Sequence, residues 1–178
     1  TKDWFSNIVY IAGDGIPFDE EKIIESEYLQ EQLIEIMEGF IPNKIWSSNN
    51  KLLNVNNINN AIEEGAAFVF FNGHGLHDLW ATYMYESTVL VPPGCYRTDH
   101  INELTNINQL PIVLSDACYH LQYDDYPDCF GWSFVANPHG GSIAFIGGSD
   151  TDLAYAGTRI VEKGIERLDI QICTLYQE

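Results

Sequence analysis

Two side chains suited to covalent chemistry each follow a strongly apolar run. His74 lies in "FVFFNGHGLHD", residues 68–78, and Cys118 lies in "PIVLSDACYH", residues 111–120. A cysteine becomes an effective nucleophile when a nearby imidazole holds it as the thiolate. The two segments therefore indicate a cysteine nucleophile with a histidine partner, if the fold brings their ends together.

The apolar runs that precede these residues are typical of buried strands, and amphipathic segments separate them. Strands are expected at 7–12, at 66–71, at 110–117 and at 141–148, with a short one at 44–47. Helices are expected at 20–40, ended by Gly39 and Pro42, and at 54–66, 99–104, 129–137 and 156–178. Apolar strands that alternate with helices predict an α/β fold with a mostly parallel sheet, flanked by helices on both faces.

The carboxyl edge of such a sheet is where functional groups gather. Two of the predicted strands end at "NGHG" and "SDAC", so His74 and Cys118 belong to this edge. Neighbouring strands lie about 4.8 Å apart, which allows the two side chains to meet. Gly75 permits close approach of a substrate backbone, and its N–H, with that of Cys118, can form an oxyanion hole.

The charge distribution restricts the partners. The chain has 26 acidic and 8 basic side chains, a net charge of -18. Such a field repels nucleic acid and anionic membranes and attracts basic polypeptides. No apolar run approaches the roughly 18 residues that a membrane span requires. We expect a polypeptide substrate, no nucleic acid and no membrane insertion.

No metal site is predicted. His74 and His77 have the spacing H-x-x-H, which lacks the i, i+4 spacing and intervening Glu of a zinc peptidase helix. The four cysteines contain no C-x-x-C pair. The acidic loop Tyr123–Asp128 is the one segment whose carboxylates suit a calcium ion, although a loop without an ion is the simpler interpretation.

The order of these motifs resembles that of the caspase-like cysteine peptidases, and above all the gingipain type. The stretches that carry the resemblance are "FNGHG", "NELTNINQLPIVLSDAC", "YPDCFGWSFV" and "GGSIAFIGGSDTD", and they span roughly residues 7–157. The resemblance implies a single caspase-like catalytic domain or subdomain over residues 1–178, taken from a longer chain with additional domains. It also implies an extracellular or cell-surface location.

By position, the resemblance assigns His74 as general acid/base, Cys118 as nucleophile and the N–H groups of Gly75 and Cys118 as oxyanion donors. An acid that orients the histidine is expected after the first strand. Asp14 is favoured there, with Asp19 as the alternative.

The resemblance also places a pocket for the substrate's P1 side chain in the loop after the 141–148 strand. Asp150 and Asp152 can pair with a P1 Arg or Lys there, and Tyr155 can stack on its stem. Glu27, in the long helix, is a further candidate acid. We therefore expect cleavage after basic residues.

Two departures from the gingipain pattern support an alternative function. Trp132 stands where relatives often carry a Glu, and relatives usually carry an additional N-terminal subdomain and C-terminal modules beyond the part that residues 1–178 resemble. A non-catalytic relative that serves as an interaction or scaffold domain is therefore the main alternative. An unrelated doubly wound domain that binds a nucleotide or a small molecule is a weaker one, because neither G-x-G-x-x-G nor a P-loop is present.

Overall fold

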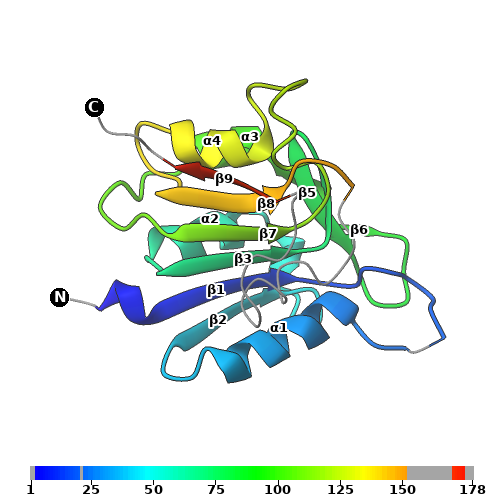
Figure 1. Cartoon of the computed structure of the whole chain (residues 1–178). Coiled ribbons are helices and arrows are strands. Elements are labelled where there is room, and N and C mark those ends of the chain that lie inside the picture. Colours follow the sequence, from blue (N-terminus) through cyan, green and yellow to red (C-terminus); the bar gives the residue numbers. More distant parts are fainter. Residues whose placement is uncertain (1–2, 21, 152–169, 175–178) are drawn as a thin grey trace.

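The structure is a computed structural model that describes residues 3–20, 22–151 and 170–174. Its centre is a six-stranded sheet in the order β2-β1-β3-β7-β8-β9 (Figure 1). The strands are β1 (Asn7–Ala12), β2 (Ile41–Trp46), β3 (Phe68–Asn72), β7 (Ile112–Asp116), β8 (Ala144–Gly148) and β9 (Ile170–Thr174). The first five run parallel to their neighbours, and β9 pairs antiparallel with β8. The predicted α/β class and mostly parallel sheet are confirmed.

Helices cover both faces of this sheet, as the apolar runs of the strands require. The helices are α1 (Glu25–Ile36), α2 (Asn56–Glu63), α3 (Thr98–Asn102) and α4 (Phe130–Ala136), with 3₁₀ turns at Trp4–Ser6 and Lys51–Leu53. Leu33 of α1 packs on one face with Tyr10, Phe70 and Leu114. The other three helices share the larger core on the opposite face, which is centred on Phe71.

A second, three-stranded antiparallel sheet follows β3 and was not predicted. It consists of β4 (His74–Leu76), β5 (Leu79–Tyr83) and β6 (Leu90–Arg97), in that order. The strands are short, and Pro92 and Pro93 interrupt the apolar pattern of β6, so the period-2 signal is weak. Trp80 nevertheless anchors the sheet, because its fully buried ring packs against Phe71.

Two expected helix boundaries are wrong. The helix predicted over 20–40 begins only at Glu25, because Lys22, within the predicted range, has a positive φ angle of 54°. Pro42 is not a helix stop but lies inside β2, where an edge strand tolerates proline.

The helix predicted over 156–178 is also wrong for residues 170–174, which form β9. The sequence of this segment, "IQICT", alternates apolar and polar residues at its start, and its pairing covers the edge of β8. Within the described residues, no helix is long and apolar enough to cross a membrane.

Gln30 joins α1 to the sheet through a buried polar cluster. The side chain is fully buried, and its Nε2 lies 3.0 Å from Ile11 O, 3.2 Å from Phe70 O and 2.9 Å from Asn72 Oδ1. Its Oε1 accepts a hydrogen bond of 2.8 Å from Trp46 Nε1. One amide therefore satisfies polar groups on three strands.

Replacement of Gln30 by Leu should remove the buried side-chain partner of the Trp46 indole and of Asn72 Oδ1. We expect the free energy of unfolding to fall by about 2–4 kcal/mol, measured by urea denaturation. Gln32→Leu is the matched control, because Gln32 makes only an exposed contact with Tyr28. Equal stabilities for the two variants would contradict this account.

Candidate active site

The carboxyl ends of β3 and β7 bring the two candidate residues together. These strands are adjacent and parallel, and their last paired residues are Asn72 and Asp116. His74 and Cys118 each lie two residues beyond that pair, at the same edge. The two strands are thus neighbours in the sheet, as predicted. Asn72 Nδ2 also donates a 3.0 Å hydrogen bond to Asp116 Oδ2, which ties the two strand ends together beneath the site.

Gly75 lies directly against the backbone of Cys118. A Cβ atom at Gly75 would fall 2.5 Å from the Cys118 carbonyl oxygen and 2.6 Å from Nε2 of His120. Both distances are too short for any side chain, so only glycine allows this approach. The loop that carries His74 and the loop that carries Cys118 are therefore in direct contact.

The His74 imidazole is held by a backbone carbonyl. Its Nε2 lies 2.8 Å from the oxygen of Gly15, and its ring packs edge-on against Tyr83, with centroids 5.3 Å apart. A carbonyl oxygen only accepts hydrogen bonds, so Nε2 must carry a proton. In the neutral ring Nδ1 is then the basic nitrogen.

The predicted orienting acid lies beside this carbonyl. Asp14 is buried, and its Oδ1 accepts a hydrogen bond of 3.2 Å from Ile16 N. Its backbone forms an isolated antiparallel bridge with Tyr83 of β5. Asp14 thereby fixes the loop from which Gly15 contacts His74. The alternative, Asp19, accepts from Lys22 N at 2.8 Å.

A cavity of about 250 Å³ opens at this edge. Its walls come from the loop after β1, from the first turns of α1 and from the ends of β3 and β7. His74 and Cys118 both line it, and Ile16 and Leu29 supply apolar wall. The cavity can therefore receive a side chain next to both groups.

Glu25 is the α1 acid that lines the cavity. Its Oε2 accepts from Gly15 N at 3.0 Å, whereas Oε1 is buried with no hydrogen-bond partner. Burial raises the pKa of Glu25, and its backbone hydrogen bonds act in the opposite direction. The carboxyl groups of Asp19 and Asp14 raise it further. Glu25 therefore brings a carboxyl group to the wall of the cavity.

Glu27, the acid of α1 expected at the pocket, is engaged elsewhere. It is buried, and its Oε1 accepts from Ser47 Oγ at 2.8 Å and from Ser48 N at 2.9 Å. It ties α1 to the turn after β2. Helical geometry explains the difference, because Glu25 and Glu27 lie roughly 200° apart around the helix.

Asp150 lies beside the cysteine loop but lines a different hollow. Its carbonyl accepts from Tyr119 N at 3.1 Å, and its exposed carboxylate accepts from Thr151 N at 2.7 Å. The hollow holds about 270 Å³ and is also lined by Asp124 and Asp125. Asp152 and Tyr155, predicted to complete this pocket, lie outside the described residues.

The acidic loop Tyr123–Asp128, considered above for calcium, does not form a set of metal ligands. Among the described residues, no group of three or more His, Cys, Asp or Glu side chains is arranged to hold a metal ion. In the loop itself, Asp125 Oδ2 accepts from Gln122 Nε2 at 3.1 Å, and Tyr126 stacks on His77. The residues present do not fit a calcium ion.

The other described cysteines differ from Cys118 in setting. Cys95 and Cys129 carry free thiols. Burial raises the pKa of the Cys129 thiol, so it stays protonated within the core. Cys95 lies on β6, and only Cys118 of the three lines the cavity.

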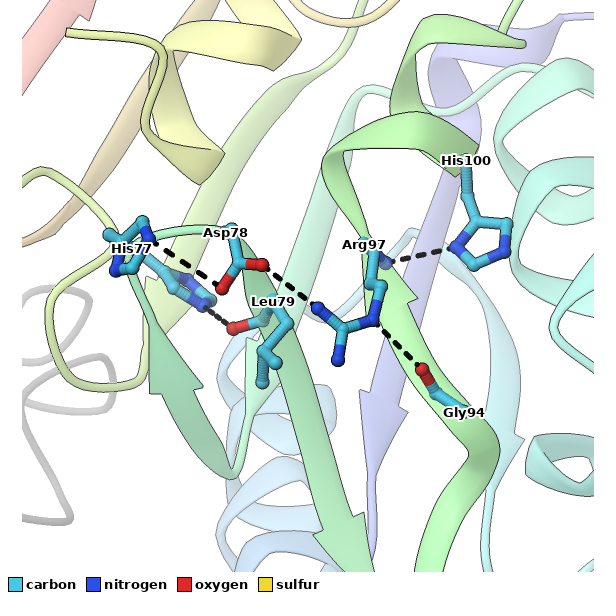
Figure 2. A network of polar contacts seen from close by, with 7 residues as sticks. His77, Asp78, Leu79, Gly94, Arg97 and His100 are labelled. Atoms are coloured by element: carbon cyan, nitrogen blue, oxygen red, sulfur yellow. Dashed lines mark hydrogen bonds and ion pairs between the residues drawn. The ribbon is translucent and has the colours of Figure 1, made fainter. Parts of the chain in front are cut away.

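A polar network braces the hairpin that follows His74 (Figure 2). Asp78, in the turn between β4 and β5, accepts a 2.8 Å hydrogen bond from Arg97 Nη1 at the end of β6. Arg97 also donates through Nε to the Gly94 carbonyl and through its backbone N–H to His100 Nδ1. The turn of the hairpin is thereby fixed to its neighbouring strand.

Sequence reasoning missed several residues that build the site. Gln30, Asn72 and Asp116 form the polar layer beneath it, and His120 packs against Gly75. A polar residue in the apolar stripe of α1, and polar residues closing two apolar strands, were the available signals. The Gly15 carbonyl leaves no such signal, because every residue carries one.

The mostly parallel sheet with helices on both faces defines the caspase-like α/β fold, which the solved gingipain structures share. The sequence profile of Peptidase family C25 matches residues 1–173. The chain therefore belongs to peptidase family C25, the gingipain family, which is a family of cysteine peptidases.

Solved structures share the fold at low sequence identity. The Arg specific cysteine proteinase gingipain R has a TM-score of 0.64 and 21% identity over 90% of this chain. A complex of the pro- and mature domains of RgpB from Porphyromonas gingivalis has a TM-score of 0.61 and 20% identity, also over 90%. A structure titled only as a protease has a TM-score of 0.67 and 16% identity over 89%.

The chain spans about a third of each of these proteins, 35%, 36% and 33% of their lengths. No curated protein matches the chain.

His120 makes the stability of the chain depend on pH. Burial lowers its pKa to about 3 from the ordinary 6.5, so the folded state binds fewer protons than the unfolded state. The free energy of unfolding that the neutral His120 contributes is present in full above about pH 6.5 and is lost as the pH falls toward 3. Between pH 7.5 and pH 5 this amounts to about 2 kcal/mol.

Urea unfolding at both pH values, for wild type and for His120→Phe, isolates this contribution. We expect the loss of stability on acidification to be smaller in the variant by about that amount. The same loss in both proteins would refute the assignment.

Proposed function

We propose that the chain is the catalytic part of a cysteine endopeptidase that uses Cys118 as nucleophile and His74 as general acid/base. The observation that carries this proposal is that both side chains line one cavity at the ends of adjacent parallel strands. The contact of Gly75 with the Cys118 backbone further supports it. The substrate is a polypeptide.

Acylation begins with the thiolate of Cys118, which attacks the carbonyl carbon of the scissile peptide bond. The carbonyl π electrons move to oxygen, and the oxyanion accepts hydrogen bonds from the N–H groups of Gly75 and Cys118. His74 then donates its Nδ1 proton to the leaving amine as the C–N bond breaks. A thioester and a free amine result.

Deacylation reverses the role of the imidazole. Neutral His74 takes a proton from water at Nδ1 as the water oxygen attacks the thioester carbon. The C–S bond breaks, the acid product leaves, and the thiolate–imidazolium pair is restored. Throughout, Nε2 keeps its proton on the Gly15 carbonyl, which fixes the ring orientation.

Specificity for a basic P1 side chain is proposed from the acids of the cleft. Glu25 lines the cavity that Cys118 also lines, and its carboxylate would pair with a guanidinium or ammonium group that enters there. Asp150, which lines the separate hollow beside the Cys118 loop, remains with Asp152 and Tyr155 the alternative P1 pocket predicted from the sequence. The net charge of -18 also favours the binding of basic substrates. A similar solved protein is described as Arg specific.

The setting of the chain is proposed from the family. We infer an extracellular or cell-surface protein in which this segment, residues 1–178, forms one catalytic domain or subdomain beside additional domains of a longer chain. The match to about a third of the length of the solved relatives agrees with this arrangement.

Cleavage of fluorogenic peptides that carry Arg, Lys, Asp or Asn at P1 tests the activity. We expect the 178-residue chain to cleave the basic peptides, and Cys118→Ala and His74→Ala to lower kcat at least about 10³-fold. Cys95→Ala is the matched control and should retain wild-type rates. Absence of cleavage, together with a Cys118 no more reactive than free cysteine, would instead support a non-catalytic interaction domain.

Glu25→Gln tests the specificity. Loss of the negative charge should lower kcat/KM for Arg and Lys peptides by about 10- to 100-fold, with little change for neutral P1 peptides. Glu31→Gln, on the same helix but paired with the exposed Lys44, is the control. Unchanged discrimination by Glu25→Gln would shift the assignment to Asp150 and Asp152.

A further inference from the structure

His120 is fixed at both its backbone and its ring. It lies two residues after Cys118 and is fully buried. Its ring stacks on Phe130 with centroids 4.0 Å apart, and its carbonyl accepts a 2.9 Å hydrogen bond from Gly131 N at the start of α4. The residue is therefore a rigid part of the larger core, although it lies beside the proposed nucleophile.

The two ring nitrogens join two different sheets. Nε2 lies 3.0 Å from the carbonyl oxygen of Leu79 on β5, and Nδ1 lies 2.7 Å from Ser115 Oγ on β7. Since the carbonyl only accepts, Nε2 carries the proton. Burial keeps the ring neutral by lowering its pKa, so Nδ1 accepts from the Ser115 hydroxyl. A directed chain of two hydrogen bonds thus runs from β7 to β5.

The same ring touches the glycine proposed as an oxyanion donor. A Cβ atom at Gly75 would lie 2.6 Å from Nε2 and 2.7 Å from Cδ2 of His120. Gly75 and Leu76 pair with Trp80 and Leu79 of β5, the strand that His120 holds through the Leu79 carbonyl. The imidazole both supports the hairpin and limits how closely it approaches the Cys118 loop.

We propose that His120 is a positioning residue that sets the separation between the Gly75 and Cys118 N–H groups, through its hydrogen bonds to Ser115 and Leu79 and its contact with Gly75. The inference rests on the proposed peptidase function, because an oxyanion forms only if Cys118 attacks a carbonyl. His120 touches no reacting atom and acts through the backbone of the hairpin.

Imidazole is the side chain that meets all these requirements. Phenylalanine preserves the ring and the stacking on Phe130 but removes the hydrogen bonds that His120 makes with the Leu79 carbonyl and the Ser115 hydroxyl. Glutamine keeps a donor for Leu79 and loses the ring. The two variants therefore separate the hydrogen bonds of the side chain from its packing.

The test compares acyl transfer with alkylation of Cys118. Alkylation by iodoacetamide requires the thiolate and no oxyanion hole, whereas peptide hydrolysis requires both. For His120→Phe we expect kcat to fall by about 10- to 100-fold with KM within about threefold, because one oxyanion donor is misplaced. The alkylation rate should stay within about threefold of wild type. His120→Gln should recover part of kcat.

His100→Phe is the control for loss of an imidazole. His100 accepts a hydrogen bond from Arg97 N through Nδ1 (Figure 2), and it is not among the residues that a Cβ atom at Gly75 would meet. His100→Phe should leave kcat unchanged. Wild-type kcat in His120→Phe would overturn the proposal. An equal fall in kcat and alkylation would also overturn it, because that result indicates a general disturbance of the site.

Hydrogen exchange of the Gly75 amide, followed by NMR, gives a readout that is independent of activity. We expect faster exchange at Gly75 in His120→Phe than in His100→Phe. Unchanged exchange would overturn the positioning role. A wild-type chain without peptidase activity would remove the proposed function, and the exchange data would still decide whether His120 holds the hairpin.

Discussion

The parallel pairing of β3 with β7 is the constraint on which the site depends. The register places Asn72 opposite Asp116, the last residues of the two strands, and each candidate catalytic side chain lies two residues beyond its strand. A slip of one residue would displace one of them by about 3.3 Å and turn its side chain to the opposite face of the sheet. The hydrogen bond between Asn72 and Asp116 opposes such a slip.

That hydrogen bond belongs to a buried polar layer that separates the apolar core from the cleft. The layer runs from Trp46 through Gln30 and Asn72 to Asp116, and so joins β2, α1, β3 and β7. Buried polar groups destabilise a fold unless they have hydrogen-bond partners. In this layer, neighbouring side chains serve as one another's hydrogen-bond partners. Because partners exist only in one arrangement, the layer also selects the position of α1 along the strands.

The sequence predicted those parts of the site that depend on side-chain type and strand order. Near-continuous apolar runs identified the buried parallel strands, and their ends located His74 and Cys118 at one edge. Parts that depend on backbone geometry were not predictable. The acceptor for His74 is a carbonyl, and the choice between Glu25 and Glu27 depended on helix phase. Residues 170–174 pair as a strand because β8 offers an edge, a tertiary effect that local sequence does not encode.

The backbone contact between His74 and Gly15 has an evolutionary consequence. An acceptor that belongs to the main chain cannot be deleted by a point substitution, and it has no ionisation of its own. The residue at that place can therefore drift in identity while the contact persists, as long as the path of the loop is kept. Selection would then act on the turn's shape, through insertions, deletions and the bridge to Tyr83, rather than on its side chains. Among homologues, we therefore expect the length of this turn to vary less than the identity of its residues.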